Sequence, residues 1–313
     1  MSDATLPHPS PANATHAAAD GWFKRALASD LFYSFRRSKL TVIAAVITLL
    51  FFLLAIFAPL LSPQNPFDPA ELQLLNSRIP PLWFADGQSP FLLGTDEQGR
   101  DVLSAILYGL RISLVVGILG VVFSGALGIG LGLIAGYFGG ALGFVIMRLI
   151  DLCLAFPGIL LALAVSAILG PGLENGVIAI AVILVPVYAR LVEGATAEVR
   201  HLPYVDAAVT LGSGAWWIIL RHILPNVSPG IIVLTTTWLG ISTLWIAALG
   251  FIGLGVQPPT PEWGEILSDG QNYITVAWWI TVFPGTFLSL FVIGVNLIGD
   301  GLRDELDPTL AMR

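Results

Sequence analysis

The chain has 313 residues, of which 56% are hydrophobic and only 11% are charged. About a quarter of the residues of a soluble domain are charged, so the composition excludes an ordinary soluble globular protein and indicates an integral membrane protein. A single cysteine, Cys153, excludes a disulfide framework and a thiolate metal cluster. The formal net charge of −7 identifies no partner, because the acidic residues are spread over several hydrophilic segments.

The first predicted elements are a polar tail and one membrane-spanning helix. Residues 1–38 form the tail, in which 1–20 are rich in Ala, Pro, Ser and Asn and are expected to be disordered. Residues 22–38 are basic and amphipathic, which is typical of a segment that lies along the membrane surface. Residues 39–61 follow as the first span, because about 20 apolar residues in a helix cross a bilayer.

Five more spans are predicted after a long hydrophilic segment. Residues 62–111 are polar and rich in proline in their first part, and they are assigned to the outward side of the membrane. Residues 112–300 hold the remaining spans together with one hydrophilic interval, 193–228, and residues 301–313 form the C-terminal tail. The five spans are expected at about 112–135, 142–169, 176–192, 229–254 and 277–298.

Lysine and arginine residues set the expected orientation, because they are concentrated on the cytoplasmic side of membrane proteins. They cluster in the N-terminal tail, in and beside the interval 193–228, and in the C-terminal tail. The last outward loop instead carries Glu262, Glu265 and Asp269 and no basic residue. The sequence therefore predicts an all-α integral membrane protein with six transmembrane helices and both termini in the cytoplasm.

The sequence predicts no catalytic residue, metal site or nucleotide site. The two lysines, Lys24 and Lys39, are not part of a glycine-rich phosphate-binding loop. The histidines lack the spacing of metal ligands, and no serine lies in a G-x-S-x-G turn. We therefore expect that the chain is not an enzyme and binds no cofactor itself.

Ionisable residues are rare in the predicted spans, which disfavours a carrier driven by protons or ions. Arg148 and Asp151 lie three residues apart near the cytoplasmic start of the third span, and a local ion pair between them is predicted. Asp300 and Arg303 repeat this spacing at the end of the sixth span, and the same interpretation applies there.

Glycines in the second span predict a packing surface. Gly128, Gly132 and Gly136 lie four residues apart, so they form one stripe along the helix. Small residues in such a stripe let a second helix approach the backbone closely. We expect this stripe to pack against another helix rather than to bind a ligand.

The fifth span carries a broad face of hydroxyl and indole groups. At 100° per residue, Thr235 nearly coincides with Ser242 around the helix, and Thr236 with Thr243. One interpretation is structural, because such hydroxyls can bond to carbonyls of their own helix. The other is that this face lines a watery passage, whose weakly polar wall releases a solute as readily as it admits it. The candidate pathway residues are Thr235, Thr236, Trp238, Ser242 and Thr243.

The interval 193–228 contains a short helix with features of a docking element. Ala207, Ala208 and Leu211 are expected to share one face after Asp206, and Gly212 is expected to end the helix. A proline further on, Pro225, is expected to prevent a continuous helix before the fifth span begins. A short helix of small residues between two such breaks suits the groove of a partner protein.

This interval resembles the EAA loop of ABC importer permeases, in which Glu-Ala-Ala is followed by a glycine and then by Ile-x-Leu-Pro. The matching residues are Asp206, Ala207, Ala208, Gly212, Leu224 and Pro225. An aspartate replaces the usual glutamate and keeps its charge. The resemblance implies a coupling helix that docks on a nucleotide-binding subunit, formed by Tyr204, Asp206, Ala207, Ala208, Leu211 and Gly212.

Other segments resemble the second, or C-type, permease of the dipeptide, oligopeptide, nickel and glutathione importers. Residues 94–101 resemble the outward signature of that group, and residues 248–264 and 299–308 resemble two further segments of it. A calcium loop at 96–101 is disfavoured by its spacing and by Arg100, and a turn closed by an Arg–Asp pair is expected. The signature residues are Gly94, Thr95, Asp96, Gly99, Arg100 and Asp101.

The resemblance implies the type I ABC importer permease fold in the bacterial cytoplasmic (inner) membrane. The implied partners are a sister permease that forms a heterodimer with this chain, two ABC ATPase subunits that use ATP and Mg, and a periplasmic or lipid-anchored solute-binding protein. The binding protein is expected to dock on residues 62–104 and 257–275. The implied function is uptake of di- or oligopeptides, with nickel, glutathione or opine-like solutes as alternatives. A stand-alone carrier or channel would leave the coupling loop unexplained.

Overall fold

The computed structural model describes residues 38–68 and 72–306, so the predicted surface helix at 22–38 and the end of the chain at 307–313 lie almost wholly outside the described residues. The described part is helical and contains no strand, with one isolated bridge between Thr95 and Asp101. The helices of the first half are α3 (Lys39–Ile56), α4 (Ala58–Leu61), η4 (Leu74–Asn76), α5 (Val102–Phe138), α6 (Gly140–Leu154) and α7 (Gly158–Leu169). Those of the second half are α8 (Leu173–Val199), α9 (Pro203–Thr210), α10 (Ala215–Ile218), η5 (Ile219–Ile223), α11 (Leu224–Phe251), α12 (Trp263–Gln271) and α13 (Trp279–Leu306).

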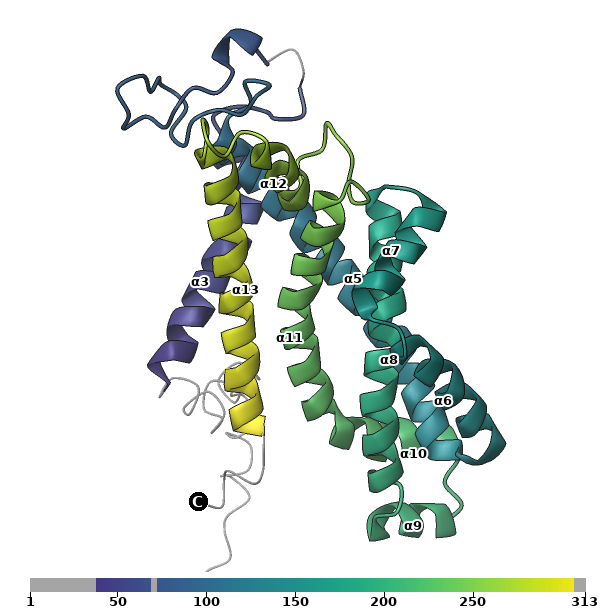
Figure 1. The fold of residues 1–313 in the computed structure, drawn as a ribbon. Helices are drawn as coiled ribbons and strands as arrows, with labels where there is room; N and C mark the ends of the chain where they lie inside the picture. The colour runs from purple at the N-terminus through teal and green to yellow at the C-terminus, as the bar shows by residue number, and fades with distance from the viewer. Residues whose placement is uncertain (1–37, 69–71, 307–313) are drawn as a thin grey trace, which may run out of the picture.

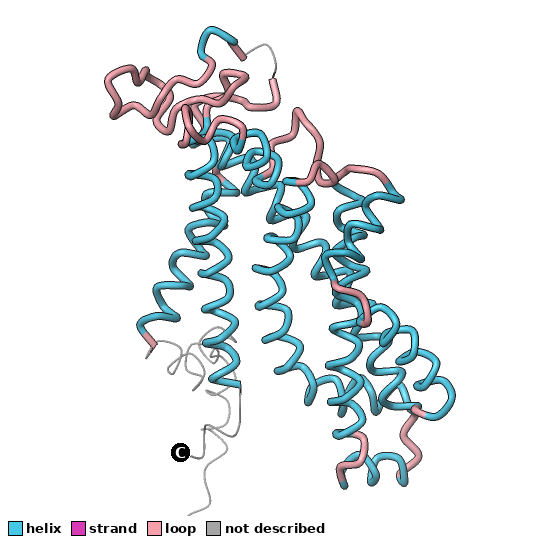
Figure 2. The backbone as a smooth tube through the Cα atoms, in the orientation of Figure 1, coloured by secondary structure: helices cyan, strands magenta, loops and turns pink. Residues whose placement is uncertain are grey.

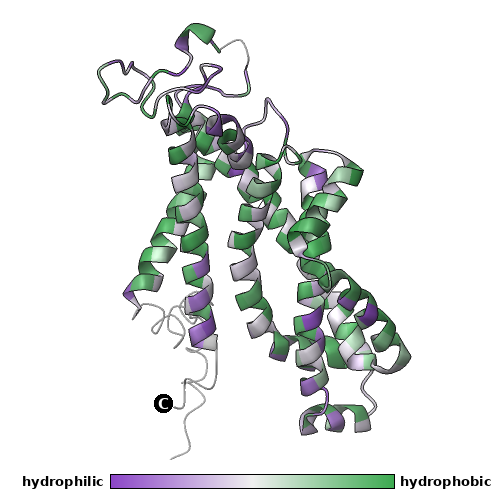
Figure 3. Cartoon of the chain, viewed as in Figure 1, coloured by the Kyte–Doolittle hydropathy of each residue, from purple (hydrophilic) through white to green (hydrophobic). Residues whose placement is uncertain are grey.

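The long helices form a bundle whose two ends differ (Figure 1). Five helices in the described residues are long and apolar enough to cross a membrane, and the bent pair α6–α7 adds a sixth if it is counted as one span. Loops gather at one end, whereas the other end has short connections and α9 (Figure 2). Hydrophobic residues cover the long helices between these ends (Figure 3). We call the end with α9 cytoplasmic and the other end outward, following the charge distribution.

The second span begins ten residues earlier than predicted. Helix α5 starts at Val102, not near Ile112, because Asp101 caps it: its Oδ2 accepts hydrogen bonds of 2.7 Å from both the backbone N–H and the hydroxyl of Ser104. Its 37 residues extend for about 55 Å at 1.5 Å per residue, well beyond a hydrocarbon core of about 30 Å. The helix runs obliquely through the bundle (Figure 1), so it contacts different neighbours at its two ends.

The third span is not the single helix predicted at 142–169. Helices α6 and α7 meet at 91°, with the break at residues 155–157. Pro157 has no N–H to continue the α6 ladder and disfavours helical geometry in the residue before it. Pro157 is extended, with φ −56° and ψ 126°, and α7 restarts directly after it at Gly158.

Helix α6 is linked to α8 by an ion pair between Asp151 and Arg190. The predicted partner of Asp151 was Arg148, and this prediction is wrong: within the described residues Arg148 makes no ion pair. Two side chains that lie three positions apart on one helix can meet, but here the neighbouring helix α8 offers Asp151 a better-placed cation, Arg190. Neither Asp300 nor Arg303, the second pair predicted, forms an ion pair with the other in the described part of the chain.

The glycine stripe of α5 packs directly on α8, as predicted. A Cβ on Gly128 would lie 2.5 Å from the Cβ of Tyr188, and one on Gly132 would lie 2.7 Å from the carbonyl oxygen of Ala189. A Cβ on Gly136 would lie 2.7 Å from the carbonyl oxygen of Glu193. Only hydrogen atoms fit at these positions, so the two helices approach at backbone distance.

Helices extend into the predicted hydrophilic interval 193–228 from both sides. Helix α8 continues to Val199, and α10, η5 and α11 form one continuous helical span from Ala215 to Phe251. Pro225 does not interrupt this span, contrary to the prediction. The π-helical turn η5 lies just before Pro225. In this turn the N–H of Leu224 donates to the carbonyl oxygen of Ile219, and this wider bonding accommodates Pro225, which has no N–H to donate.

Candidate functional site

The coupling segment forms helix α9 at the cytoplasmic end of the bundle (Figure 1). Pro203 occupies its first turn, and Gly212 lies just beyond its end with φ +80°. The N–H of Ser213 donates to Ala208 O at 3.1 Å and that of Gly212 donates to Val209 O at 2.9 Å. These two bonds form a Schellman motif, so Gly212 ends the helix as predicted.

Ala207, Ala208 and Leu211, which were predicted to share one face, differ in exposure. Ala208 is buried with Val205 against the rest of the chain, whereas Leu211 is 86% exposed. The helix therefore has an inner edge that packs and an outer edge that is open. The open edge carries Tyr204, Asp206, Ala207 and Leu211.

The inner edge of α9 joins it to the start of the fifth span. Val205 and Ala208 belong to the same apolar cluster as Ile219 and Ile223 of η5. A polar link lies beside this contact, where the side chain of Asn226 donates to the Tyr204 hydroxyl at 2.9 Å and to His222 O at 2.7 Å. Helix α9 is therefore attached to the cytoplasmic end of α11.

A pocket of about 400 Å³ lies beside α9. Its walls include Tyr137 and Phe138 from the end of α5, Arg200 from the end of α8, and Asp206 and Val209 from α9. The Arg200 guanidinium lies 5.7 Å from the Tyr137 ring centroid, a cation–π arrangement that holds the guanidinium in place. Asp206 is thus an exposed carboxylate at the rim of a depression, where a side chain from another protein can reach it.

The hydroxyl face predicted on the fifth span is divided by neighbouring helices. Ser242 and Thr243 are buried against α5, where a Cβ on Gly117 would lie 3.0 Å from Thr243 Oγ1 and 3.3 Å from Ser242 Oγ. Thr236 lies on the same side of the helix, nearer the cytoplasm, and is partly exposed. Because α5 crosses α11 obliquely, it covers this face at one level and leaves it open at another.

The hydroxyls of this face bond mainly to their own helix. Thr235, Thr236 and Thr243 donate to carbonyls four residues earlier at 2.7–3.0 Å. Thr235 also accepts a 3.1 Å bond from the hydroxyl of Tyr188 in α8, a partner that the sequence did not predict. Trp238 packs against the apolar cluster that also contains Ile219 and Ile223. Thr236 is therefore the candidate pathway residue whose position best fits an open wall.

The outward signature folds into a tight turn before α5. Asp96 Oδ1 accepts hydrogen bonds from the backbone N–H groups of Gln98 and Arg100, and its Oδ2 pairs with Arg100 Nε at 2.5 Å. Gly94 and Gly99 have φ of +84° and +78°, which a glycine adopts without strain. The predicted Arg–Asp pair that closes this turn is thus confirmed.

The same turn contacts helix α12, a contact that the sequence did not reveal. The Arg100 guanidinium lies 3.8 Å from Glu265 and 3.6 Å from Asp269. Burial alone would lower the pKa of Arg100, but the carboxylates of Asp96, Glu265 and Asp269 outweigh it and raise that pKa. Burial raises the pKa of Glu265 to about 7, and the negative charge of Asp269 acts in the same direction against the attraction of Arg100.

A fully buried carboxylate fixes the start of α12. Glu262 caps this helix by accepting from the N–H of Gly264 at 2.8 Å, and its other oxygen accepts from the Ser113 hydroxyl of α5 at 2.9 Å. Next to it, the indole N–H of Trp263 donates to Ile106 O at 3.0 Å. Helix α12 is therefore attached to α5 through buried polar bonds, and no short-range sequence pattern predicts a contact between residues so distant in the chain.

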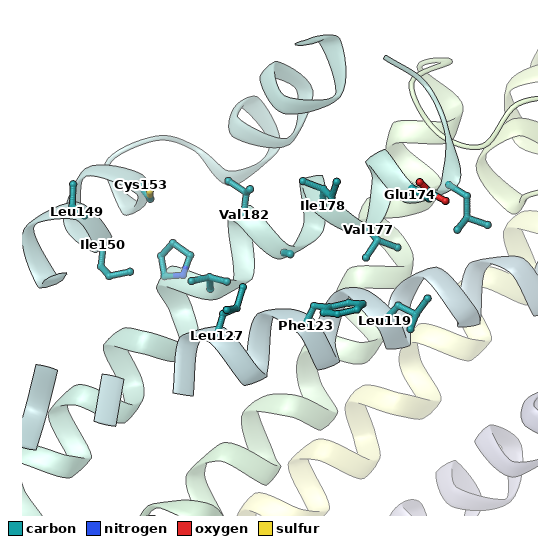
Figure 4. Close-up of a pocket in the computed structure, with 14 residues that line it drawn as sticks. Leu119, Phe123, Leu127, Leu149, Ile150, Cys153, Glu174, Val177, Ile178 and Val182 are labelled. Carbon is teal, nitrogen blue, oxygen red and sulfur yellow. The ribbon is translucent and has the colours of Figure 1, made fainter. Parts of the chain in front are cut away.

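A separate apolar groove of about 650 Å³ lies along α5, α6 and α8 (Figure 4). Leu119, Phe123 and Leu127 form one wall, and side chains of α6 and α8 face them (Figure 4). Glu174 lies at one end of this groove. The rest of the lining is almost entirely apolar, so the groove suits lipid or another apolar helix rather than a polar solute.

Within the described ranges 38–68 and 72–306, no group of His, Cys, Asp and Glu side chains is arranged to hold a metal ion. The buried carboxylates of Asp96 and Glu265, at the outward end, face the guanidinium of Arg100, whose positive charge opposes the binding of a cation. The arrangement therefore supports a structural role for this cluster.

Comparisons with known proteins agree with this geometry. Residues 128–312 match the family model described as "Binding-protein-dependent transport system inner membrane component", and residues 27–81 match the N-terminal transmembrane domain of oligopeptide transport permease C. The chain is 48% identical to the di/tripeptide transport system permease protein DppC of Pseudomonas aeruginosa, over 84% of this chain and 87% of that one. It is 41% identical to the glutathione transport system permease protein GsiD of Pectobacterium atrosepticum, over 88% and 89%.

A solved structure has the same fold at low sequence identity. The MetNI methionine ABC transporter, in an inward-facing conformation, contains a chain that superposes with a TM-score of 0.52 and 19% identity. The match covers 65% of this chain and 96% of that one. At this identity the likeness shows the fold alone.

Proposed function

Because the chain belongs to the family of binding-protein-dependent transport system inner membrane components and is a multi-pass permease subunit of an ABC importer, we propose that it takes up di- or tripeptides with a sister permease. Relatives named for dipeptide and di/tripeptide transport match most of its length at 41–48% identity, which supports this solute class. A glutathione permease is similar at 41%, so glutathione, itself a tripeptide, is the second candidate.

The sister permease is proposed to cover the open face of α11. Large apolar side chains remain exposed along this helix, among them Ile232 (48%), Leu244 (46%) and Phe251 (41%). Thr236 is partly exposed on the same helix, with its hydroxyl bonded to its own backbone. Two such faces in a heterodimer would enclose a weakly polar passage that offers a solute few strong binding groups.

Helix α9 is proposed to receive the force of ATP hydrolysis. In this proposal the chain catalyses no reaction, and two partner ATPase subunits bind ATP and Mg and hydrolyse the ATP. When they close, they push on the outer edge of α9, where Asp206 is exposed. The apolar cluster that α9 shares with η5 and the hydrogen bond between Tyr204 and Asn226 pass the displacement to α11. The outward residues 62–104 and 257–275 are proposed to receive the binding protein.

The observation that carries this proposal is the exposed Asp206 on a helix attached to the fifth span. We expect Asp206→Lys to abolish uptake and to uncouple ATPase activity from transport, because it reverses the charge that faces the ATPase. Asp206→Glu, which restores the residue usual in this family, should retain both activities. Normal uptake by the Asp206→Lys protein in membranes would refute the coupling role.

A separate experiment tests the solute and the need for partners. The chain is purified with its co-purifying subunits, reconstituted in liposomes with ATP inside, and supplied with a binding protein and labelled dipeptide, tripeptide or glutathione. Uptake of peptide only by the complete complex supports the proposal. Uptake by the isolated chain without ATPase subunits would instead identify a stand-alone carrier.

A further inference from the structure

Besides Leu74 and Leu75 of η4, four large apolar side chains remain exposed further along the outward segment between α4 and α5. The exposed fractions of Leu82, Trp83, Phe84 and Leu92 are 44%, 59%, 44% and 45%, and we call these four residues the aromatic tip. The N–H of Leu82 donates to Leu92 O at 3.2 Å, so both ends of the tip lie side by side. The one charged residue between positions 79 and 93 is Asp86.

The tip lies at the outward end of a membrane-spanning helix. The ring of Trp83 is 6.0 Å from that of Phe283, and the ring of Phe84 is 6.4 Å from that of Trp278. Trp278 immediately precedes α13, whereas Phe283 lies one turn inside it, about 6 Å along the axis from Trp279. Trp83 therefore lies beside the first turn of this span, not above it.

The exposed side of α13 continues the apolar surface of the tip. Leu290 and Ile293 lie seven and ten residues after Phe283, which places them on the same side of the helix. They are 45% and 55% exposed. Exposed apolar side chains thus recur from Trp83 down this side of α13, which also carries Thr286, and the upper end of the series is aromatic.

The tip is held firmly in this position. The segment behind it is fixed by hydrogen bonds from Thr95 N–H to Ile79 O at 2.9 Å and from the indole of Trp279 to Thr95 O at 3.1 Å. The indole N–H of Trp83, in contrast, makes no hydrogen bond in the described part of the chain. It is free to bond to water or to lipid head groups.

We propose that the aromatic tip is immersed in the outer interface of the lipid bilayer and anchors the outward segment to the membrane surface. Indole rings prefer the boundary between head groups and acyl chains, where the apolar ring is shielded and its N–H is hydrated. The position beside the first turn of α13 puts Trp83 at this boundary. The anchor fixes the height of the outward segment above the membrane, and therefore that of the turn at Asp96–Asp101. The binding protein would then dock on the residues of 62–104 outside the aromatic tip.

Nitroxide labels on single cysteines test this proposal. In a Cys153→Ala background, Trp83→Cys is labelled in the complete complex in lipid nanodiscs, and its collisions with oxygen, which concentrates in lipid, are compared with those with a water-soluble nickel chelate. Leu75→Cys is the matched control, because Leu75 of η4 is also a large apolar residue of this segment and is 95% exposed. We expect the oxygen-to-nickel collision ratio to be several-fold higher at position 83 than at 75.

Two results would overturn the proposal. A ratio at position 83 equal to that at 75 would place the tip in water, and a label protected from both reagents would show that a protein partner covers it. Phe84→Cys supplies a second label site should the Trp83 variant assemble poorly. A ratio at position 84 as low as that at 75 would overturn the proposal in the same way.

Discussion

Glu265 is a buried carboxylate whose two oxygens accept no hydrogen bond in the described structure. Its pKa is raised to about 7 by burial and by Asp269, from an ordinary value of 4.5. Between these two values the folded protein holds a proton that the unfolded chain has lost. The proton on Glu265 therefore stabilises the folded protein fully below about pH 4.5. This contribution to the free energy of unfolding, up to roughly 3 kcal/mol, is lost as the pH rises through 7.

This sign leads to a prediction for thermal unfolding. The apparent melting temperature of the detergent-purified complex should fall between pH 5 and pH 7.5, and Glu265→Gln should reduce that fall because a glutamine carries no titrating proton. Asp86→Asn, which removes a carboxylate at an exposed position of the outward segment, is the control for the change of charge. An unchanged slope in the Glu265→Gln protein would show that its proton is not linked to folding.

Two neighbouring glycines of α5 offer a matched comparison of packing. A Cβ on Gly132 would lie 2.7 Å from Ala189 O and 2.8 Å from Val192 Cβ, whereas Gly130 has no atom within 4 Å. Gly132→Ala should therefore separate α5 from α8 and destabilise the bundle by about 1–3 kcal/mol. Gly130→Ala should be neutral or slightly stabilising, since alanine favours a helix. Equal melting temperatures for the two purified variants would contradict this interpretation.

At the scale of elements, prolines show what could be predicted from the sequence and what could not. Apolar length and glycine spacing predicted the existence of the spans and of a close helix contact along the α5 stripe, because both depend on local periodicity, but not that the partner is α8. Pro157 separates two helices at 91°, yet Pro186, Pro229 and Pro284 lie inside long helices. Whether a proline ends a helix depends on neighbours that satisfy or replace its missing bond, and these come from the tertiary fold.

The end of α9 provides a prediction about backbone geometry alone. Gly212 has φ +80°, and a Cβ there would meet no atom within 4 Å, so any effect of Gly212→Ala comes from its left-handed conformation. The cost is about 1–2 kcal/mol, which should loosen α9 and reduce the coupling of ATP hydrolysis to uptake. Gly214→Ala is the control, because Gly214 has an ordinary φ of −67° and equally open surroundings. Coupling is measured as solute transported per ATP hydrolysed, and identical ratios for the two variants would count against a rigid α9.

The packing of the whole molecule decides which part of the hydroxyl face of α11 is open. The sequence predicted this face but not which helices cover it. Thr236 and Thr243 are seven residues apart and lie on one side of α11, so periodicity could not distinguish them. Their different exposure arises because α5, more than 100 residues earlier in the chain, crosses only the level of Thr243. Likewise, Ser113 and Glu262 are 149 residues apart, and only the fold brings them together.

The assembled importer allows this difference to be tested. In a Cys153→Ala background, Thr236→Cys should react with a water-soluble thiol reagent in the complete complex, and the reaction should block uptake if this level of α11 lines the passage. Ser242→Cys is the matched control, since Ser242 is also a hydroxyl residue of this helix but is only 1% exposed. We expect its reaction to be at least tenfold slower, because the reagent cannot reach a side chain packed against Gly117. If the cysteine at 242 reacted as fast as the one at 236, α5 would have to move away from α11 during the transport cycle, and the passage would extend along the whole hydroxyl face.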